Sequence, residues 1–337
     1  MTEADEKFDI EAAPDRAERK ALRRLYNSVG GAMTIQYILV YVIYFLFLLT
    51  LSPFISEQND PETGADIVGW AELAAMYFSP VLASAIVFFA FNAIKKVDVG
   101  AMLGTRGITP QLIGHCVLMT FAFHSVGMLL EYGVDIVLYS ADYEVTAFDY
   151  EMAKDGASAA VDLISSVIAA PIAEELFFRG LVLKQTSRVS VRFGIVFSAV
   201  MFGLMHGNPY QLVMATVIGL YFGFITVKTD SLIPSMICHI AINSMICISE
   251  MAGYFSDELG NAAFEAVFAA EIILGIIGII LYRKSGEKAV LPPYTKYHKK
   301  RTLPIILTSA WVIIITLIYI YDIINSFSPI TDTVTSC

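Results

Sequence analysis

The stretch "AAPIAEELFFRGLVLK", residues 169–184, places two adjacent carboxylates and an arginine inside an apolar run long enough to enter a lipid bilayer. These charged residues are Glu174, Glu175 and Arg179. An ionisable side chain at the centre of a membrane helix costs about 2.5 to 3.5 kcal/mol on insertion scales. Charged residues in such a segment are therefore expected to have partners or a function.

The composition of the whole chain is that of a membrane protein. Of its 337 residues, 56% are hydrophobic and 16% are charged, and the mean hydropathy is +0.65. The apolar residues come in blocks of roughly 20, the length that a helix needs to cross a bilayer core. We expect an all-α, polytopic membrane helix bundle with about nine transmembrane helices, at 32–53, 68–94, 109–131, 158–183, 191–207, 211–228, 232–250, 263–282 and 303–324.

The lysines and arginines predict how these spans are oriented. Six of them precede the first span, three lie in the second connection, three in the fourth, one in the sixth and seven in the eighth. One side of the membrane thus receives 20 of the 22 basic residues. Positive residues mark cytoplasmic loops, so the N-terminus is predicted inside and the C-terminus outside. No secretory signal is expected, because no apolar core precedes the charged N-terminal stretch.

Other classes of function find little support in the sequence. The net charge of −10 comes largely from predicted outside loops and from the N-terminal segment, where acids are typical of a solvated surface. The four cysteines show no CxxC spacing, so neither a disulfide framework nor a zinc knuckle is predicted. We find no phosphate loop and no nucleic-acid signature, and expect no nucleic-acid partner. Gly219 and Gly223 form a GxxxG pattern, which is typical of close helix packing in membranes.

Two further spans carry polar residues. "FSAVMFGLMHGNPY", residues 197–210, contains His206, and "KTDSLIPSMICHIAINSM", residues 228–245, contains His239 and Asn243 on one helical face. Counting about 1.5 Å per residue from the basic boundary, Glu174 and these three residues fall in one layer near the middle of the membrane. Polar groups at that depth are accommodated when they face a wet cavity.

The chemistry of these residues is complementary. Glu175 and Arg179 are four residues apart with the acid first, which favours an ion pair and leaves Glu174 for another task. A buried carboxylate can act as a general base toward water, and a histidine such as His206 can position that water. His239 and Asn243 could donate hydrogen bonds to an oxyanion. This set indicates hydrolysis of a peptide bond without a covalent intermediate.

The three motifs resemble those of a known family. "EELFFRG" fits EExxxR, "FGLMH" fits FxxxH and "HIAIN" fits HxxxN of the CAAX protease and bacteriocin-processing family of intramembrane glutamate endopeptidases. The resemblance implies that Glu174 and His206 activate the water and that His239 and Asn243 form the oxyanion hole. Glu175 and Arg179 would then support the site structurally. The motifs span Glu174 to Asn243, while the flanking spans match only in character.

The resemblance also implies a division of the chain and a partner. We expect a cytoplasmic segment at 1–31, transmembrane helices at 32–157, the catalytic core at 158–250, and C-terminal transmembrane helices with a short tail at 251–337. The substrate would be a membrane-associated peptide or protein, either a lipidated CAAX protein or a peptide such as a bacteriocin precursor. The expected location is a multi-pass position in the lipid bilayer of the plasma membrane.

Three alternatives stay open at this stage. No cofactor is expected, but one glutamate and two histidines could bind zinc and leave a position for water, although the HExxH spacing is absent. A non-catalytic scaffold or a bacteriocin-immunity or regulatory protein could retain the motifs. A transporter could use carboxylates at this depth for protons, but paired interrupted helices are not evident in the two halves of the sequence.

Overall fold

A computed structural model describes residues 16–55, 66–145, 150–152, 155–253, 255–285 and 304–330 of the chain. Part of the sequence that predicts the orientation lies outside these residues. The first 15 residues hold one of the six N-terminal basic residues, and residues 286–303 hold five of the seven in the eighth connection.

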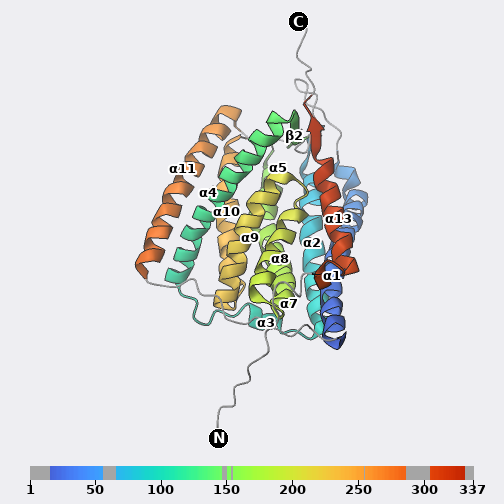
Figure 1. The fold of residues 1–337 in the computed structure, drawn as a ribbon. Helices are drawn as coiled ribbons and strands as arrows, with labels where there is room; N and C mark the ends of the chain where they lie inside the picture. Colours follow the sequence, from blue (N-terminus) through green and yellow to red (C-terminus); the bar gives the residue numbers. More distant parts are fainter. Residues whose placement is uncertain are drawn as a thin grey trace.

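The described residues form an all-α bundle in which every predicted span coincides with a helix (Figure 1). Seven helical segments are long and apolar enough to cross a membrane, which confirms an integral, multi-pass membrane protein. Two predicted spans correspond to shorter apolar helices, α8 and α13. The principal helices are α1 (Arg16–Leu51), α2 (Trp70–Lys95), α4 (Pro110–Ser140), α8 (Val191–Met205), α9 (Pro209–Thr229), α10 (Ile233–Gly253), α11 (Asp257–Ser285) and α13 (Ala310–Asn325).

The fourth span is a composite helix. It runs through α5 (Gly156–Asp162), η2 (Leu163–Ala169), α6 (Ala170–Glu174), η3 (Glu175–Leu183) and α7 (Lys184–Thr186), and both η2 and η3 are π-helical. π-Helical turns are rare in proteins, and those that occur are frequently located at functional sites. The motif with the two glutamates therefore lies at the junction of α6 and η3 rather than in a uniform α-helix.

The first helix begins 16 residues before the predicted start of the span at residue 32. Its early part has a basic face, and the opposite face buries Leu22, Tyr26 and Val29. The Tyr26 ring lies edge-on to Phe193 and Phe197, with ring centroids 6.2 and 6.1 Å apart. Part of the expected N-terminal segment is thus a packed helix, because its apolar residues recur at helical spacing.

Short strands that the hydropathy pattern did not predict pair at the end of the bundle where β2 and the start of α5 lie (Figure 1). β1 (Asp66–Val68) pairs parallel to β3 (Tyr150–Met152), and β2 (Tyr143–Val145) pairs antiparallel to β4 (Phe327–Pro329). The short helices α3 (Val99–Met102) and α7 lie at the opposite end, near the start of α1. Connections predicted to share a side of the membrane therefore share an end of the bundle. That this end faces the cytoplasm stays a prediction.

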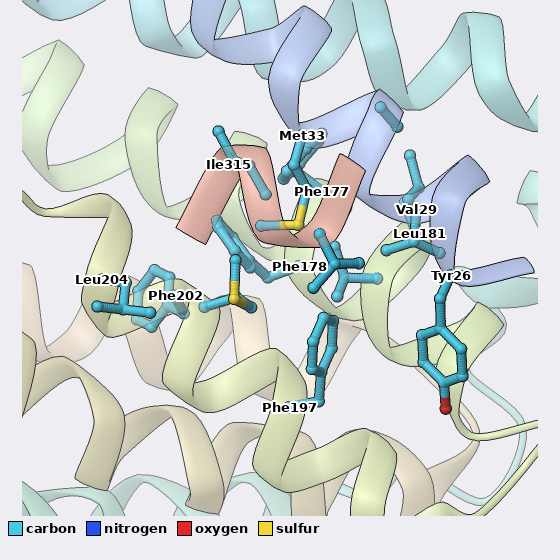
Figure 2. Close-up of a cluster of buried hydrophobic side chains, with 14 of the residues drawn as sticks. Tyr26, Val29, Met33, Phe177, Phe178, Leu181, Phe197, Phe202, Leu204 and Ile315 are labelled. Atoms are coloured by element: carbon cyan, nitrogen blue, oxygen red, sulfur yellow. The ribbon is translucent and has the colours of Figure 1, made fainter. Parts of the chain in front are cut away.

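A core of large apolar side chains holds the composite helix against α1, α8 and α13 (Figure 2). Phe177, Phe178 and Leu181 of η3 are fully buried there. The hydroxyl of Ser198 in α8 donates to the carbonyl oxygen of Phe178 at 2.9 Å. The apolar residues of the EELFFRG motif thus anchor η3, which fixes the position of the two glutamates.

The predicted GxxxG face brings α9 close to α8. A Cβ atom at Gly219 would lie 3.1 Å from the Cα of Ala199, and one at Gly223 would lie 3.2 Å from the Cγ2 of Ile195. At such distances the neighbouring atoms would have to move by a few tenths of an ångström to admit a larger residue. The close approach predicted from the glycine spacing is confirmed.

Candidate active site

The four polar residues predicted from three separate spans line one cavity. The cavity has a volume of about 230 Å³ and is lined by Glu174, His206, His239 and Asn243 together with Ser166, Gln211, Glu250 and several apolar side chains. Its walls come from the composite helix, α8, α9 and α10. Ionisable side chains inside a membrane bundle usually face such a cavity, so this arrangement explains how the chain tolerates them.

The two adjacent glutamates have different surroundings. The Glu175 carboxylate is fully buried, and its Oε1 atom lies 3.0 Å from Nη1 of Arg179. The Glu174 side chain is 21% exposed and lines the cavity. The ion pair predicted from the i, i+4 spacing is present, and Glu174 is not part of it.

Aromatic rings and a carbonyl complete the surroundings of Arg179. Its guanidinium carbon lies 4.5 Å from the centre of the Phe202 ring and 5.4 Å from that of Phe222. Its Nη2 donates to the carbonyl oxygen of Gly219 at 3.4 Å. A cation over aromatic faces is attracted by their ring quadrupoles, and the attraction is stronger where water is excluded. The guanidinium is thereby held in the bundle interior beside Glu175.

His239 lies between the two glutamates. Its Nδ1 is 3.1 Å from Oε1 of Glu175, and its Nε2 is 3.6 Å from Oε2 of Glu174. Because a carboxylate accepts hydrogen bonds, the Nδ1 atom carries a proton, which it donates to Glu175. The Nε2 atom is left to face Glu174 and the cavity. Glu175 therefore orients the imidazole as well as neutralising Arg179.

His206 is oriented by its own helix. It follows the last residue of α8, and its Nδ1 donates to the carbonyl oxygen of Phe202 at 2.8 Å. In a neutral imidazole with Nδ1 protonated, Nε2 is an acceptor. His206 can then accept a hydrogen bond from a water in the cavity. The Phe202 ring packs edge-on against His206, with ring centroids 4.9 Å apart.

Asn243 is held by a carbonyl that a proline leaves free. The N–H of Ala170 bonds to Ser165 in the π-helical register, so the carbonyl of Ser166 would next pair with residue 171. Pro171 has no N–H to donate. The Nδ2 atom of Asn243 donates to the Ser166 carbonyl instead, at 2.7 Å. A side-chain amide has two N–H donors, and the second is free for another acceptor.

The composite helix that carries this site has a defined start. Asp155 caps α5, and its carboxylate accepts hydrogen bonds from the backbone N–H groups of Ala157 and Ser158 at 2.8 and 2.9 Å. The hydrogen bond from the Ser158 N–H is the main cause that lowers the pKa of Asp155 below its ordinary value. The cap satisfies N–H groups that have no partner within the helix.

Residues that sequence reasoning missed complete the site. Phe202 contacts Arg179, His206 and His239, although its sequence position indicates only a member of the FxxxH pattern. Ser166 and Phe222 were not singled out at all. The phenylalanine of the FxxxH pattern could have been noticed, because it lies one turn before His206. Ser166 and Phe222 carry no such signal.

The structure also shows a group of side chains that could hold a metal ion. Among the described residues, one set of three His, Cys, Asp or Glu side chains has its ligand atoms within 4.8 Å of one another. It consists of Asp162, Cys247 and Glu250, next to the cavity, and it contains none of the residues considered above as zinc ligands. The sequence analysis did not predict this group, because Asp162 is distant from the other two in the chain.

Comparison with known proteins supports the resemblance seen in the motifs. Residues 156–245 match the family described as Type II CAAX prenyl endopeptidase Rce1-like, and this range contains all three motifs. A Bacillus subtilis (strain 168) protein, "Uncharacterized protein YyaK", is 27% identical over 277 residues, which cover 74% of this chain and 88% of that protein. No solved structure matches the chain.

Proposed function

Residues 156–245 belong to the Rce1-like type II CAAX prenyl endopeptidase family, and on this premise we propose that the chain is an intramembrane endopeptidase in which Glu174 activates a water. The family is one of proteases, which makes the protein a hydrolase in general terms. The observation that carries the specific proposal is the cavity, in which Glu174, His206, His239 and Asn243 meet from three helices.

The first step is attack on the substrate carbonyl. Glu174 takes a proton from a water that also donates a hydrogen bond to Nε2 of His206. The water oxygen forms a bond to the carbonyl carbon, and the carbonyl electrons move to its oxygen. Because the Glu174 side chain is partly exposed to the cavity while Glu175 is enclosed, Glu174 is the carboxylate that a water can reach.

The second step is collapse of the tetrahedral intermediate. His239 and Asn243 donate hydrogen bonds to the oxyanion, which stabilises the charge that develops there. The carbon–nitrogen bond then breaks, and Glu174 returns its proton to the leaving amine. For Nε2 of His239 to donate while Nδ1 donates to Glu175, the imidazole must be protonated. Two carboxylates and two cations then make a set with no net charge, which suits a site inside a membrane.

The proposed substrate is a membrane-associated peptide or protein, and the plasma membrane is the proposed location. A prenylated CAAX peptide is the first candidate, because the family name specifies it. A bacteriocin-type or other membrane peptide is the second. The position of the cavity within the bundle supports a substrate that approaches from the bilayer or its surface.

A comparative peptidome, including protein C-termini, tests the proposal. Cells with the wild type are compared with cells carrying Glu174→Gln at equal levels in the membrane. We expect specific cleavage products to disappear in the variant, and these products identify the substrate. If the two peptidomes match and the variant still rescues the phenotype of a gene knockout, Glu174 is not a catalytic base and the protein acts as a scaffold or regulator.

Chelation separates the glutamate mechanism from a catalytic zinc. A purified sample is treated with a strong chelator and assayed on a substrate identified in the peptidome. The proposed mechanism predicts that cleavage persists. Loss of cleavage that zinc restores would indicate instead that Glu174, His206 and His239 bind a catalytic ion.

A further inference from the structure

Beyond Asn243, the cavity is also lined by Glu250, near the end of α10. The end of α10 and the start of α5 lie at the same end of the bundle (Figure 1). Along α10, His239, Asn243 and Cys247 are separated by four residues each, and Glu250 follows three later, so all four lie on one helical face. Across from them, Ser166 and Asp162 are also four apart on the composite helix. The two helices thus carry a continuous row of polar groups beyond the proposed catalytic residues.

From this row we infer a binding site for one zinc-class divalent cation, formed by Asp162, Cys247 and Glu250. The ligand atoms of these side chains lie within 4.8 Å of one another. The ligands of a tetrahedral zinc ion with bonds of about 2.0 to 2.3 Å are about 3.3 to 3.8 Å apart. The ligand atoms would therefore have to approach one another by about an ångström to bind the ion. The exposed Glu250 side chain is free to move by that distance.

A second observation, the surroundings of Asp162, points to a cation at this position. Asp162 is only 3% exposed, and its Oδ1 accepts a hydrogen bond from the hydroxyl of Ser166 at 2.8 Å. Its Oδ2 is buried and has no hydrogen-bond partner among the described residues. A buried carboxylate oxygen without a partner is costly unless a cation or a donor satisfies it. A cation between Asp162, Cys247 and Glu250 would remove that cost.

The donor set decides the class of cation. Calcium and magnesium prefer oxygen ligands, whereas a thiolate selects softer ions such as zinc. Cys247 is a free cysteine that is 4% exposed. Three protein ligands leave a fourth position of a tetrahedral ion for water. The expected ion is therefore zinc, and cobalt can replace it as a spectroscopic probe.

Two connections link this site to the proposed catalytic cavity. Glu250 lines the cavity and is exposed, so it lies at the cavity opening. Ser166 donates its hydroxyl to Asp162 and accepts from Asn243 through its carbonyl. A cation that draws Glu250 toward Asp162 would narrow the opening and restrain Asn243. Binding of a cation to this site should thus inhibit peptide cleavage, and this consequence rests on the proposed function.

Binding can be tested without any substrate. The full chain, purified in detergent under reducing conditions and stripped with a chelator, is titrated with Co²⁺. We expect one equivalent to bind with a thiolate-to-cobalt charge-transfer band in the near ultraviolet, and zinc to displace it. Cys247→Ser should abolish the band, whereas Cys116→Ser, a matched change at a buried cysteine in α4, should retain it.

The remaining ligands are tested by affinity. Glu250→Gln changes an exposed side chain, and Asp162→Asn preserves the shape of the buried one. Each should weaken cobalt binding by about tenfold or more, as expected when a ligand loses its charge. The proposed site is wrong if the folded wild type shows no charge-transfer band, or if the band persists in Cys247→Ser.

Inhibition is measured separately as the ratio of cleavage rates with and without zinc. We expect the ratio to fall well below one for the wild type and to return toward one in Glu250→Gln. A ratio of one in cobalt-binding protein would overturn the inhibitory role while the site itself stands. If no cleavage is detected but cobalt binds, the protease proposal fails and the metal site does not.

Discussion

His124 and His239 each meet a glutamate from another helix, but the two pairs lie in different surroundings. Nδ1 of His124 in α4 is 2.7 Å from Oε2 of Glu271 in α11, and both side chains are almost fully buried. The other two polar atoms of this pair, His124 Nε2 and Glu271 Oε1, are buried without a hydrogen-bond partner among the described residues. His239 pairs with Glu175 in the same way, but its Nε2 faces a second glutamate and a cavity.

A buried histidine–carboxylate pair is therefore not by itself a catalytic signal. The pair between α4 and α11 joins two helices, and both of its side chains are almost fully buried. The pair between α10 and η3 orients an imidazole whose other nitrogen is available. What separates them is the presence of Glu174 and of open space beside His239. Changes to the two regions should therefore affect different measurements.

The largest expected effect is on catalysis, through Glu174→Gln. Removal of a general base should lower kcat/KM by about 10² to 10⁴-fold. The unfolding midpoint should hardly change, because Glu174 lines the cavity and takes no part in the buried ion pair with Arg179. The assay is cleavage of a substrate identified in the peptidome, or of a quenched fluorescent prenylated CAAX peptide. Unchanged cleavage in folded protein would contradict the proposed role.

The second effect is on stability, through Arg179→Met. This change leaves the fully buried Glu175 carboxylate without its cation and should cost about 3 to 5 kcal/mol of unfolding free energy. Equilibrium unfolding in mixed detergent micelles measures it. The double variant Glu175→Met, Arg179→Met serves as the control and should recover part of the loss. A single variant more stable than the double would show that the ion pair is not the reason for the loss.

A smaller loss of stability is expected for the pair between α4 and α11, through Glu271→Gln. The change replaces a charged hydrogen bond to His124 with a neutral one and should cost about 1 to 3 kcal/mol. Cleavage per folded molecule should stay at the wild-type level, in contrast to Glu174→Gln. A fall in kcat without a change in folding would mean that the α4–α11 pair is coupled to the site.

Gly219→Ala tests how tightly the Arg179 side of the site is packed. The added methyl would lie 3.1 Å from the Cα of Ala199 and 3.3 Å from Nη2 of Arg179, so a cost of about 1 to 3 kcal/mol is expected. Gly133→Ala in α4 is the matched control, because a Cβ there meets no atom within 4 Å. That control should gain up to about 1 kcal/mol from helix propensity. Equal melting temperatures for the two variants would show that the α8–α9 contact can relax.

Local patterns in the chain were enough to predict the helices and four of the polar residues that line the cavity. Hydropathy located the spans, because a segment that crosses a bilayer must be apolar over about 20 residues. Spacing of four residues paired Glu175 with Arg179 and placed His239 and Asn243 on one face, because side chains one turn apart are neighbours on a helix. The polar residues stood out because charge inside an apolar run is costly.

Which of those residues contact one another depends on the tertiary structure. The contact of His239 with Glu175 spans 64 residues, and that of Asn243 with Ser166 spans 77. The contact of His124 with Glu271 spans 147 residues, and the group formed by Asp162, Cys247 and Glu250 also joins distant parts of the chain. Such contacts depend on how each helix is rotated against its neighbours. That rotation is set by the packing of many side chains together, which no local pattern records.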